Sequence, residues 1–492
     1  MRQLSLPERP GSDSTPKGVG HMTLATESTK AKKAPTVPSV GLRRRVADVT
    51  RWQTRELLLG ALRRLGPWGA KYDQPRLEPL HSGSIKLYRW HKKPYGSEDK
   101  PMSLLEIPWD YVEENQHQTP FLGLREYWYP ALISKELRNN QPKAITLLGD
   151  NLVFFRDNNG QARALENRCP HRGAFLSLGQ VGVYEPGTIT CRYHGMTFDG
   201  RGECVAYLSD GPNSSISGRI RARSYPVEEH NGVIFIYMGD REPEPVIDSV
   251  PHADTVLKGV GEFFLDRVQL PYSYLNLLDN TVDLTHPGIL HRNCLQFIGQ
   301  ATEVGSVSTK RLPDGGLYAY FTDTPDHPGR MNLVDQTWYL PNMIYAPIGR
   351  SPVLAGGGWG WFVPVDIGNH HFWFIARLTN PERAERKLVT KAKKGLASFA
   401  MGRIAGRDFF WPGSAKSCLD GGDAPIQASQ GRIVRWDMEK LTSADRATVQ
   451  VRRIMQEAHQ AEIAERAANG IPERRIHRPL APMEREAPVH VR

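Results

Sequence analysis

Cysteine is scarce in this chain. Its 492 residues include five cysteines: Cys169, Cys191, Cys204, Cys294 and Cys418. An odd number at low density, with no apolar leader and cleavage site before it, argues against a disulfide framework and is typical of a reducing compartment. The chain also has no apolar run of roughly 18–20 residues, the length that a membrane span needs. We therefore expect a soluble, cytoplasmic protein.

Net charge is absent from the body of the chain, although the whole chain carries +10. Residues 1–65 hold 13 Lys and Arg against 5 Asp and Glu, and residues 471–492 hold 5 against 3. The 45 basic and 45 acidic residues that remain cancel each other. Nucleic-acid binding requires a basic patch on the folded surface, so this distribution argues against it.

No internal repeat is visible, so the domains are inferred from changes in composition. Residues 1–41 are rich in Ser, Thr, Pro and Lys without a hydrophobic period, which predicts a disordered basic tail. Residues 42–118 form an N-terminal extension that begins with a basic amphipathic helix. We expect a small β domain over 119–242, a larger mixed domain over 243–470 and a tail over 471–492.

The two folded regions differ in their hydrophobic patterns. The first has short β-branched runs separated by Gly, Pro and Asn-Gly, which predicts hairpins. Its expected strands cover 144–148, 152–155, 188–190 and 233–237. The second has strand-like runs at 360–364 and 371–376, then a helix over 442–469 that opens with a Thr442…Asp445 capping box. The chain is therefore predicted to be α+β.

Two Cys/His pairs stand in the β domain, as Cys169-Pro-His171 and Cys191-Arg-Tyr-His194. Histidines in place of two cysteines on one iron of a diiron cluster make the cluster easier to reduce. The surrounding glycines let backbone N–H groups approach bridging sulfides. A Cys₂His₂ zinc site is the main alternative. Zinc fingers tend to pair like residues within one loop, whereas each loop here carries one residue of each kind.

These residues resemble the C-x-H…C-x-x-H signature of the Rieske family. The resemblance implies that one [2Fe–2S] cluster is bound by Cys169, His171, Cys191 and His194. The sequence departs from the family at Met196, where many members have Trp. Because this position is not a ligand, we expect the change to affect local packing alone.

A second group of candidate ligands lies between Asp279 and His291. On a helix, Asp283 and His286 would share a face, and Pro287-Gly288 would then end or distort that helix. Two histidines and one carboxylate on one face of Fe(II) leave positions open for O₂ and substrate. From these residues alone, capping or packing roles for the histidines remain open.

The same segment matches the N-x-x-D-x-x-H-x₄-H motif of Rieske ring-hydroxylating oxygenases, and the chain resembles their alpha subunits over roughly residues 118–468. The resemblance implies that His286 and His291 bind a mononuclear Fe(II). It implies that Asp283 bridges a ligand histidine to the cluster of a neighbouring subunit. It also makes Asn280 a supporting residue of the site.

The third ligand is expected far along the chain. The run from Asp423 to Gly431, followed by Glu439 to Asp445, resembles the carboxylate region of the phthalate dioxygenase-like branch. The resemblance implies Asp423 as the third ligand, with Asp420 as the fallback. Without the family pattern, Asp423 would be read as a surface aspartate in a Gly-rich loop.

The resemblance implies a terminal oxygenase, with an antiparallel sheet flanked by helices in the helix-grip (START-like) manner. Electrons from NAD(P)H would arrive through a ferredoxin or a flavin-containing reductase, and O₂ would hydroxylate or demethylate an aromatic or other small cyclic substrate. A homotrimer is implied, with electrons crossing between protomers through His194 and Asp283. The alternatives are a Rieske-type electron carrier and an iron-binding regulatory protein. An electron carrier has no need of an open iron site.

Overall fold

The computed structural model describes residues 78–82, 85–89, 106–211, 213–259, 262–286, 307–321, 337–347, 357–378 and 423–478. The expected tail over 1–41, the amphipathic helix at its neighbour 42–65, His291 and Asp420 lie outside these residues. Within the described part of the chain, no helix combines the length and apolarity that crossing a bilayer requires.

Three small antiparallel sheets build the region expected to be all-β. Their strand orders are β10-β9-β8-β7, β11-β6-β5-β4 and β12-β13-β3. The strands are β3 (Trp128–Ile133), β4 (Lys143–Leu147), β5 (Asp150–Arg156), β6 (Ala162–Glu166), β7 (Gln180–Val181), β8 (Ile189–Thr190), β9 (Met196–Phe198), β10 (Cys204–Tyr207), β11 (Ser224–Tyr225), β12 (Val227–His230) and β13 (Val233–Tyr237). The four strands expected here coincide with β4, β5, β8 and β13 to within two residues at each end.

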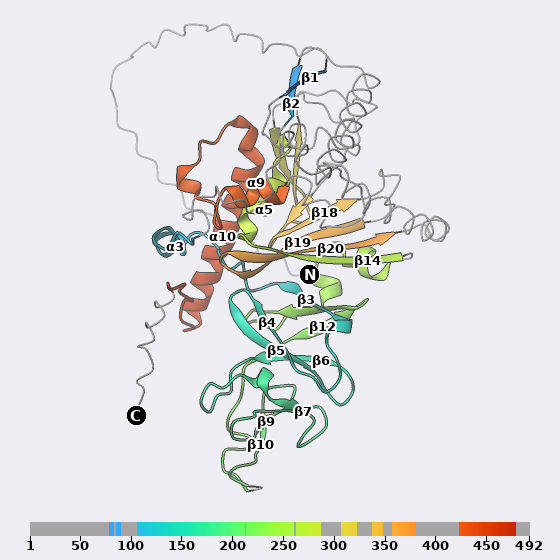
Figure 1. Cartoon of the computed structure of the whole chain (residues 1–492), viewed down its shortest axis with the longest axis vertical. Coiled ribbons are helices and arrows are strands. Elements are labelled where there is room, and N and C mark those ends of the chain that lie inside the picture. The colour runs from blue at the N-terminus through green and yellow to red at the C-terminus, as the bar shows by residue number, and fades with distance from the viewer. Residues whose placement is uncertain are drawn as a thin grey trace, which may run out of the picture. The chain divides into compact units, whose positions relative to one another are not determined.

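The larger region is organised on one seven-stranded antiparallel sheet in the order β14-β20-β19-β18-β17-β16-β15. Figure 1 shows β14, β20, β19 and β18 side by side in this sheet. The strands are β14 (Glu262–Leu270), β15 (Val307–Arg311), β16 (Leu317–Phe321), β17 (Thr337–Tyr339), β18 (Met343–Pro347), β19 (Gly357–Asp366) and β20 (Asn369–Leu378). The strands expected at 360–364 and 371–376 lie within β19 and β20.

Alternating residues of β19 supply two separate cores. Trp359 and Trp361 are buried with residues of β3 and β13, while the intervening Phe362 is buried with residues of the helices. This alternation follows from the period of two along a strand. Gly360 allows β18 to approach, because a Cβ there would lie 2.8 Å from Ile344 Cγ1. The sheet therefore joins the Rieske-like strands on one face to the helices on the other.

Three helices pack on the second face of the sheet: α5 (Tyr274–Val282), α9 (Ala424–Ser429) and α10 (Arg446–Ala468). The helix α10 follows a 3₁₀ turn, η8 (Ser443–Asp445), in which the Thr442…Asp445 capping box is present as expected. An antiparallel sheet flanked by helices is thus confirmed, and so is the α+β class.

Shorter elements complete the described chain: a hairpin of β1 (Glu78–Ser82) and β2 (Ile85–Arg89), the helices α3 (Trp109–Asn115) and α4 (Val246–Ser249), the π-helix η4 (Asp254–Lys258), and the 3₁₀ turns η2 (Ser134–Glu136), η3 (Leu176–Leu178) and η7 (Trp436–Met438). Tyr111 and Val112 of α3 are buried with residues of α5 and α10. The end of the expected N-terminal extension therefore shares the core of the larger region.

Candidate metal centres

Two loops of the same construction carry the first group of candidate ligands. In one loop the Gly173 N–H donates to the Cys169 carbonyl over 2.9 Å, and in the other the Gly195 N–H donates to the Cys191 carbonyl over 3.0 Å. Both glycines have positive φ, 75° and 74°, a conformation that glycine adopts without a steric penalty. Each closed turn encloses one cysteine and one histidine of the predicted ligand set.

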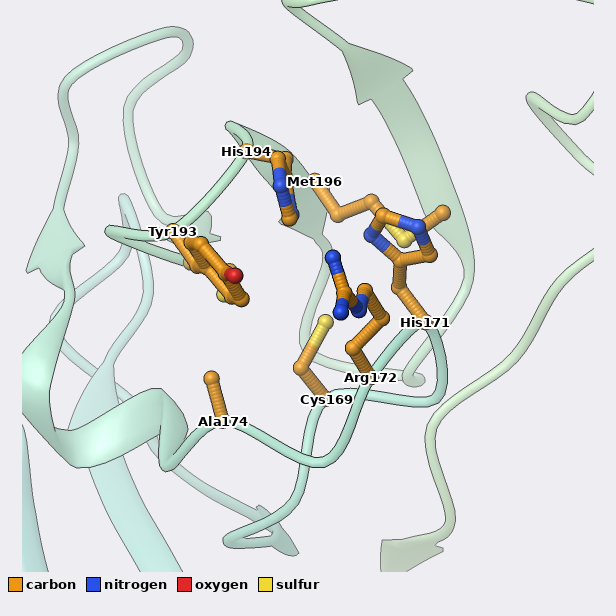
Figure 2. Close-up of a pocket in the computed structure, with 8 residues that line it drawn as sticks. Cys169, His171, Arg172, Ala174, Tyr193, His194 and Met196 are labelled. Carbon is orange, nitrogen blue, oxygen red and sulfur yellow. The ribbon is translucent and has the colours of Figure 1, made fainter.

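The two loops bring the four predicted cluster residues to one place. The rings of His171 and His194 lie 4.6 Å apart between centroids, at an interplanar angle of 61°, and in Figure 2 they approach each other from different loops. Cys169 and Cys191 are buried free thiols. All four line one cavity with an empty volume of about 170 Å³.

Two further residues border this cavity. Met196, at the position where the sequence departs from the Rieske pattern, is 1% exposed and packs in the core beneath the loops. Tyr193 stacks on His194 with 3.8 Å between ring centroids and is 57% exposed. His194 is therefore covered on one side by an aromatic ring that faces solvent.

The electrostatics of the empty loops suit a metal that displaces protons. Burial, with the nearby Cys191 thiol adding to it, raises the pKa of Cys169 to about 11. Desolvation and the neighbouring His171 and Arg172 lower the pKa of His194, so its imidazole stays neutral. Neutral imidazoles and metal-deprotonated thiols are the ligand forms that iron requires. The donor set and its placement in two glycine-closed loops fit a Rieske cluster.

The second group of candidate ligands begins at the end of α5. The helix stops at Val282, so Asp283 and His286 both lie beyond it and do not share a helical face as expected. The Asp283 carboxylate accepts hydrogen bonds from the Thr285 N–H and hydroxyl, both over 2.7 Å. A side chain that captures the following backbone N–H in this way competes with the helix. The helix therefore ends one turn earlier than the Pro287-Gly288 pair predicted.

His286 and Asp423 meet across a long sequence separation. His286 Nδ1 lies 2.9 Å from the Asp283 carbonyl oxygen, to which it can donate, and His286 Nε2 lies 3.5 Å from Asp423 Oδ1. A proton held on Nδ1 leaves Nε2 with a lone pair for a metal. Two ligand atoms 3.5 Å apart can both reach one ion at ordinary bond lengths of roughly 2.1 Å. His291 lies outside the described residues.

A hydrogen-bond relay orients the Asp423 carboxylate. Asn280 Nδ2 donates to Asp423 Oδ1 over 3.0 Å, and Gln427 Nε2 donates to Asn280 Oδ1 over 2.8 Å. Gln427 is 4% exposed. Asn280 was predicted to support the site, whereas Gln427 was not assigned a role. The Q-x-S-x-G run that begins at Gln427 was the available signal.

A buried ion network ties α5 to α10 below this site. Arg452 of α10 donates to the Asp279 carboxylate, with Nη2 to Oδ2 at 2.6 Å, and also to Glu439. Trp436 Nε1 donates to the same aspartate over 3.2 Å. Desolvation raises the pKa of Asp279 to about 6, although Arg452 opposes this. The network accounts structurally for the Glu439 and Arg452 that follow the Asp423 run.

Comparison with known proteins gives this geometry a family. Residues 127–216 match the family model described as the Rieske [2Fe-2S] domain. The alpha subunit of phenoxybenzoate dioxygenase from Ectopseudomonas oleovorans is 30% identical over 349 residues, which cover 68% of this chain and 80% of that protein. The chain belongs to the Rieske non-haem iron oxygenases. Within this family it is an oxygenase (alpha) subunit.

Two other proteins extend the likeness. The oxygenase subunit of 3-chlorobenzoate-3,4-dioxygenase from Comamonas testosteroni is 37% identical over 198 residues, or 40% of this chain and 42% of that protein. The solved terminal oxygenase of carbazole 1,9a-dioxygenase from Nocardioides aromaticivorans has the same fold, with a TM-score of 0.53 at 20% identity over 71% of this chain and 98% of that one. As a Rieske oxygenase, the chain uses a [2Fe–2S] cluster, a mononuclear iron and electrons derived from a reductase.

Proposed function

We propose that this oxygenase acts in the cytoplasm on an aromatic or other small cyclic substrate, which it hydroxylates or demethylates. The observation that carries the proposal is the approach of His286 to Asp423 on the chain that also bears the two cluster loops. An electron carrier would need the loops and nothing more. Relatives named for phenoxybenzoate and chlorobenzoate support an aromatic substrate.

The assignment of ligands follows from the two groups of side chains. Cys169, His171, Cys191 and His194 would hold the cluster. His286, His291 and Asp423 would hold the mononuclear iron as two imidazoles and one carboxylate, the set that leaves open positions for O₂ and substrate. When bound, the cluster supplies electrons and the mononuclear iron supplies the chemistry of O₂ activation.

The protein's own residues hold this site in one arrangement. The Asp283 carbonyl keeps the His286 proton on Nδ1, while Asn280 and Gln427 fix the direction of the Asp423 carboxylate. Partners of ligands in this position typically change metal affinity or activity about 10–100-fold when removed. We assign Asn280 and Gln427 this positioning role.

The surface near the cluster loops favours assembly into a homotrimer with electron transfer between protomers. Large apolar side chains there are exposed, including Leu178 at 66% and Tyr193 at 57%. An apolar rim of this kind marks a protein–protein contact. We infer that His194 of one protomer meets Asp283 of the next across this contact, and that a ferredoxin or a flavin-containing reductase delivers electrons to the assembled enzyme.

The proposal is tested by iron analysis together with substrate-dependent O₂ uptake. Protein purified without oxygen should contain about three irons per chain and a reducible diiron spectrum. With a surrogate reductase, one member of a panel of aromatic acids, aryl ethers and heterocycles should stimulate O₂ uptake and give an oxidised product. Asp423→Ala should lose the mononuclear iron and keep the diiron spectrum. Colourless protein that contains zinc, or an Asp423→Ala variant with full turnover, contradicts the proposal.

A further inference from the structure

An arginine-rich pocket adjoins the cluster-binding loops. Its lining includes Arg168, Arg223, Arg466 and Arg474 together with Asp150 and Glu166. The pocket has an empty volume of about 810 Å³ that is continuous with solvent, within the size range of small-molecule sites. Arg168 immediately precedes Cys169 in the sequence. None of these residues has a part in the reaction proposed above.

The pocket carries more positive than negative charge. Its four arginines exceed its two acidic residues by two charges. Nearby carboxylates do not offset the difference, because each is shared. Asp240 pairs with both Arg223 and Arg466, and Asp150 pairs with both Arg474 and Arg125, a neighbouring arginine outside the lining. Desolvation and the nearby Arg125 lower the pKa of Arg474, as expected where cations crowd together.

Two of the lining arginines have donors left over. Arg466 has a buried Nε that makes no hydrogen bond with any residue in the described part of the chain, and its side chain is 16% exposed. Arg168 makes no ion pair with a described residue, and its guanidinium lies against Gly173, where a Cβ would be 2.8 Å from Nη2. A buried donor without a partner is unfavourable. An acceptor from outside the chain would satisfy it.

We propose that the arginine-rich pocket binds a small multivalent oxyanion, one that carries carboxylate or phosphate oxygens. Guanidinium groups present paired N–H donors that match carboxylate and phosphate oxygens. A surplus of two positive charges suits an anion of charge −2. The binding is independent of the reaction at the mononuclear site and goes beyond it.

Calorimetric titration of the intact, iron-loaded protein tests the proposal, with inorganic phosphate and succinate as probes in buffer of low chloride. We expect one saturable site per chain for at least one probe. Tighter binding of phosphate indicates a phosphorylated ligand, and tighter binding of succinate indicates a dicarboxylate. Arg466→Gln should weaken binding by about tenfold or more, because a charge-assisted contact is lost.

Two matched variants keep the test decisive. Glu166→Gln removes a carboxylate from the lining and should strengthen binding severalfold, which provides evidence even where Arg466→Gln fails to fold. Arg221→Gln removes an equal charge from an exposed ion pair with Glu203 outside the pocket and should leave affinity unchanged. The proposal is overturned if neither probe gives a saturable signal. It is also overturned if binding by the folded Arg466→Gln or Glu166→Gln variant equals that of the wild type and of Arg221→Gln.

Discussion

The two groups of candidate ligands are built in opposite ways. The cluster ligands lie between Cys169 and His194, in two glycine-closed turns that each form from neighbouring residues. The mononuclear site joins the end of α5 to the start of α9, and the Asn280–Asp423 contact spans 143 positions. Local turns can therefore prearrange the first site, whereas the second depends on packing of distant elements. Variants that disturb one kind of construction without the other can test this contrast.

The largest effect is expected where the two sites would be linked. Asp283→Asn should retain both iron centres but lower turnover to below about one hundredth, because the carboxylate that would carry the contact to the neighbouring cluster becomes a neutral amide. Iron content, the diiron spectrum and the rate at which the reduced cluster is reoxidised measure this. Asp437→Asn, which alters an exposed ion pair with Arg435, is the control. Substantial turnover in an iron-replete Asp283→Asn protein refutes the bridge between protomers.

A smaller effect on activity is expected at the relay that holds the distant carboxylate. Gln427→Ala should weaken mononuclear iron binding by about 10–100-fold, because Asn280 loses the donor that orients it. The diiron spectrum should not change, since the cluster loops fold locally. Gln430→Ala, a change of an exposed residue three positions along, should leave both iron centres intact. Equal iron binding by these two variants would remove the positioning role of Gln427.

What the sequence could predict follows the same contrast. The cluster ligands and the hairpin strands were predictable because each depends on residues close in sequence, as does the Thr442…Asp445 capping box. The end of α5 was predicted wrongly, because the Asp283 side chain captures the Thr285 N–H. Helical spacing alone gives no sign of such a contact.

Other features depend on contacts that no local pattern contains. Gln427 reaches Asn280 across 147 positions, and the arginine-rich pocket unites Gly149 with Arg474. The sheet's edge strand β14 was not predicted either. Its residues Glu262 to Leu270 gain their extended conformation from pairing along the whole of β20, a partner more than 90 residues later. Tertiary pairing therefore decides these elements.

Local construction also predicts how the cluster loops fail. Gly195→Ala should destabilise the protein by about 1–2 kcal/mol through its left-handed backbone, and by about 1–3 kcal/mol more through overlap, because the new Cβ would lie 2.6 Å from Leu208 Cβ. Gly232→Ala has a similar φ of 79° with open space around it, so it isolates the backbone contribution. Denaturant unfolding, with the diiron absorbance as a second signal, separates the two variants. Equal destabilisation by both would mean that the loop tolerates the overlap.

The larger domain should be the more sensitive to acid, because its sheet buries neutral histidine. His370 is fully buried, with Nδ1 2.7 Å from the Tyr272 carbonyl oxygen, and desolvation lowers its pKa to about 4. The unfolded chain, with the ordinary histidine pKa of 6.5, binds the proton more readily than the native state. Stability is therefore complete above pH 6.5 and is lost as the pH falls towards 4, by about 2 kcal/mol at pH 5 for this residue.

The adjacent His371 acts in the same direction, since desolvation and then Arg267 lower its pKa to about 4 as well. His370→Asn keeps a donor near the position of Nδ1 but cannot be protonated. It should therefore roughly halve the loss of unfolding free energy between pH 7 and pH 5, measured by tryptophan fluorescence in urea, whatever its stability at pH 7. His117→Asn, at an exposed position, should leave the slope unchanged. If His370→Asn has the same slope as the wild type, the sensitivity to acid lies elsewhere, and the contrast between the two domains no longer extends to pH.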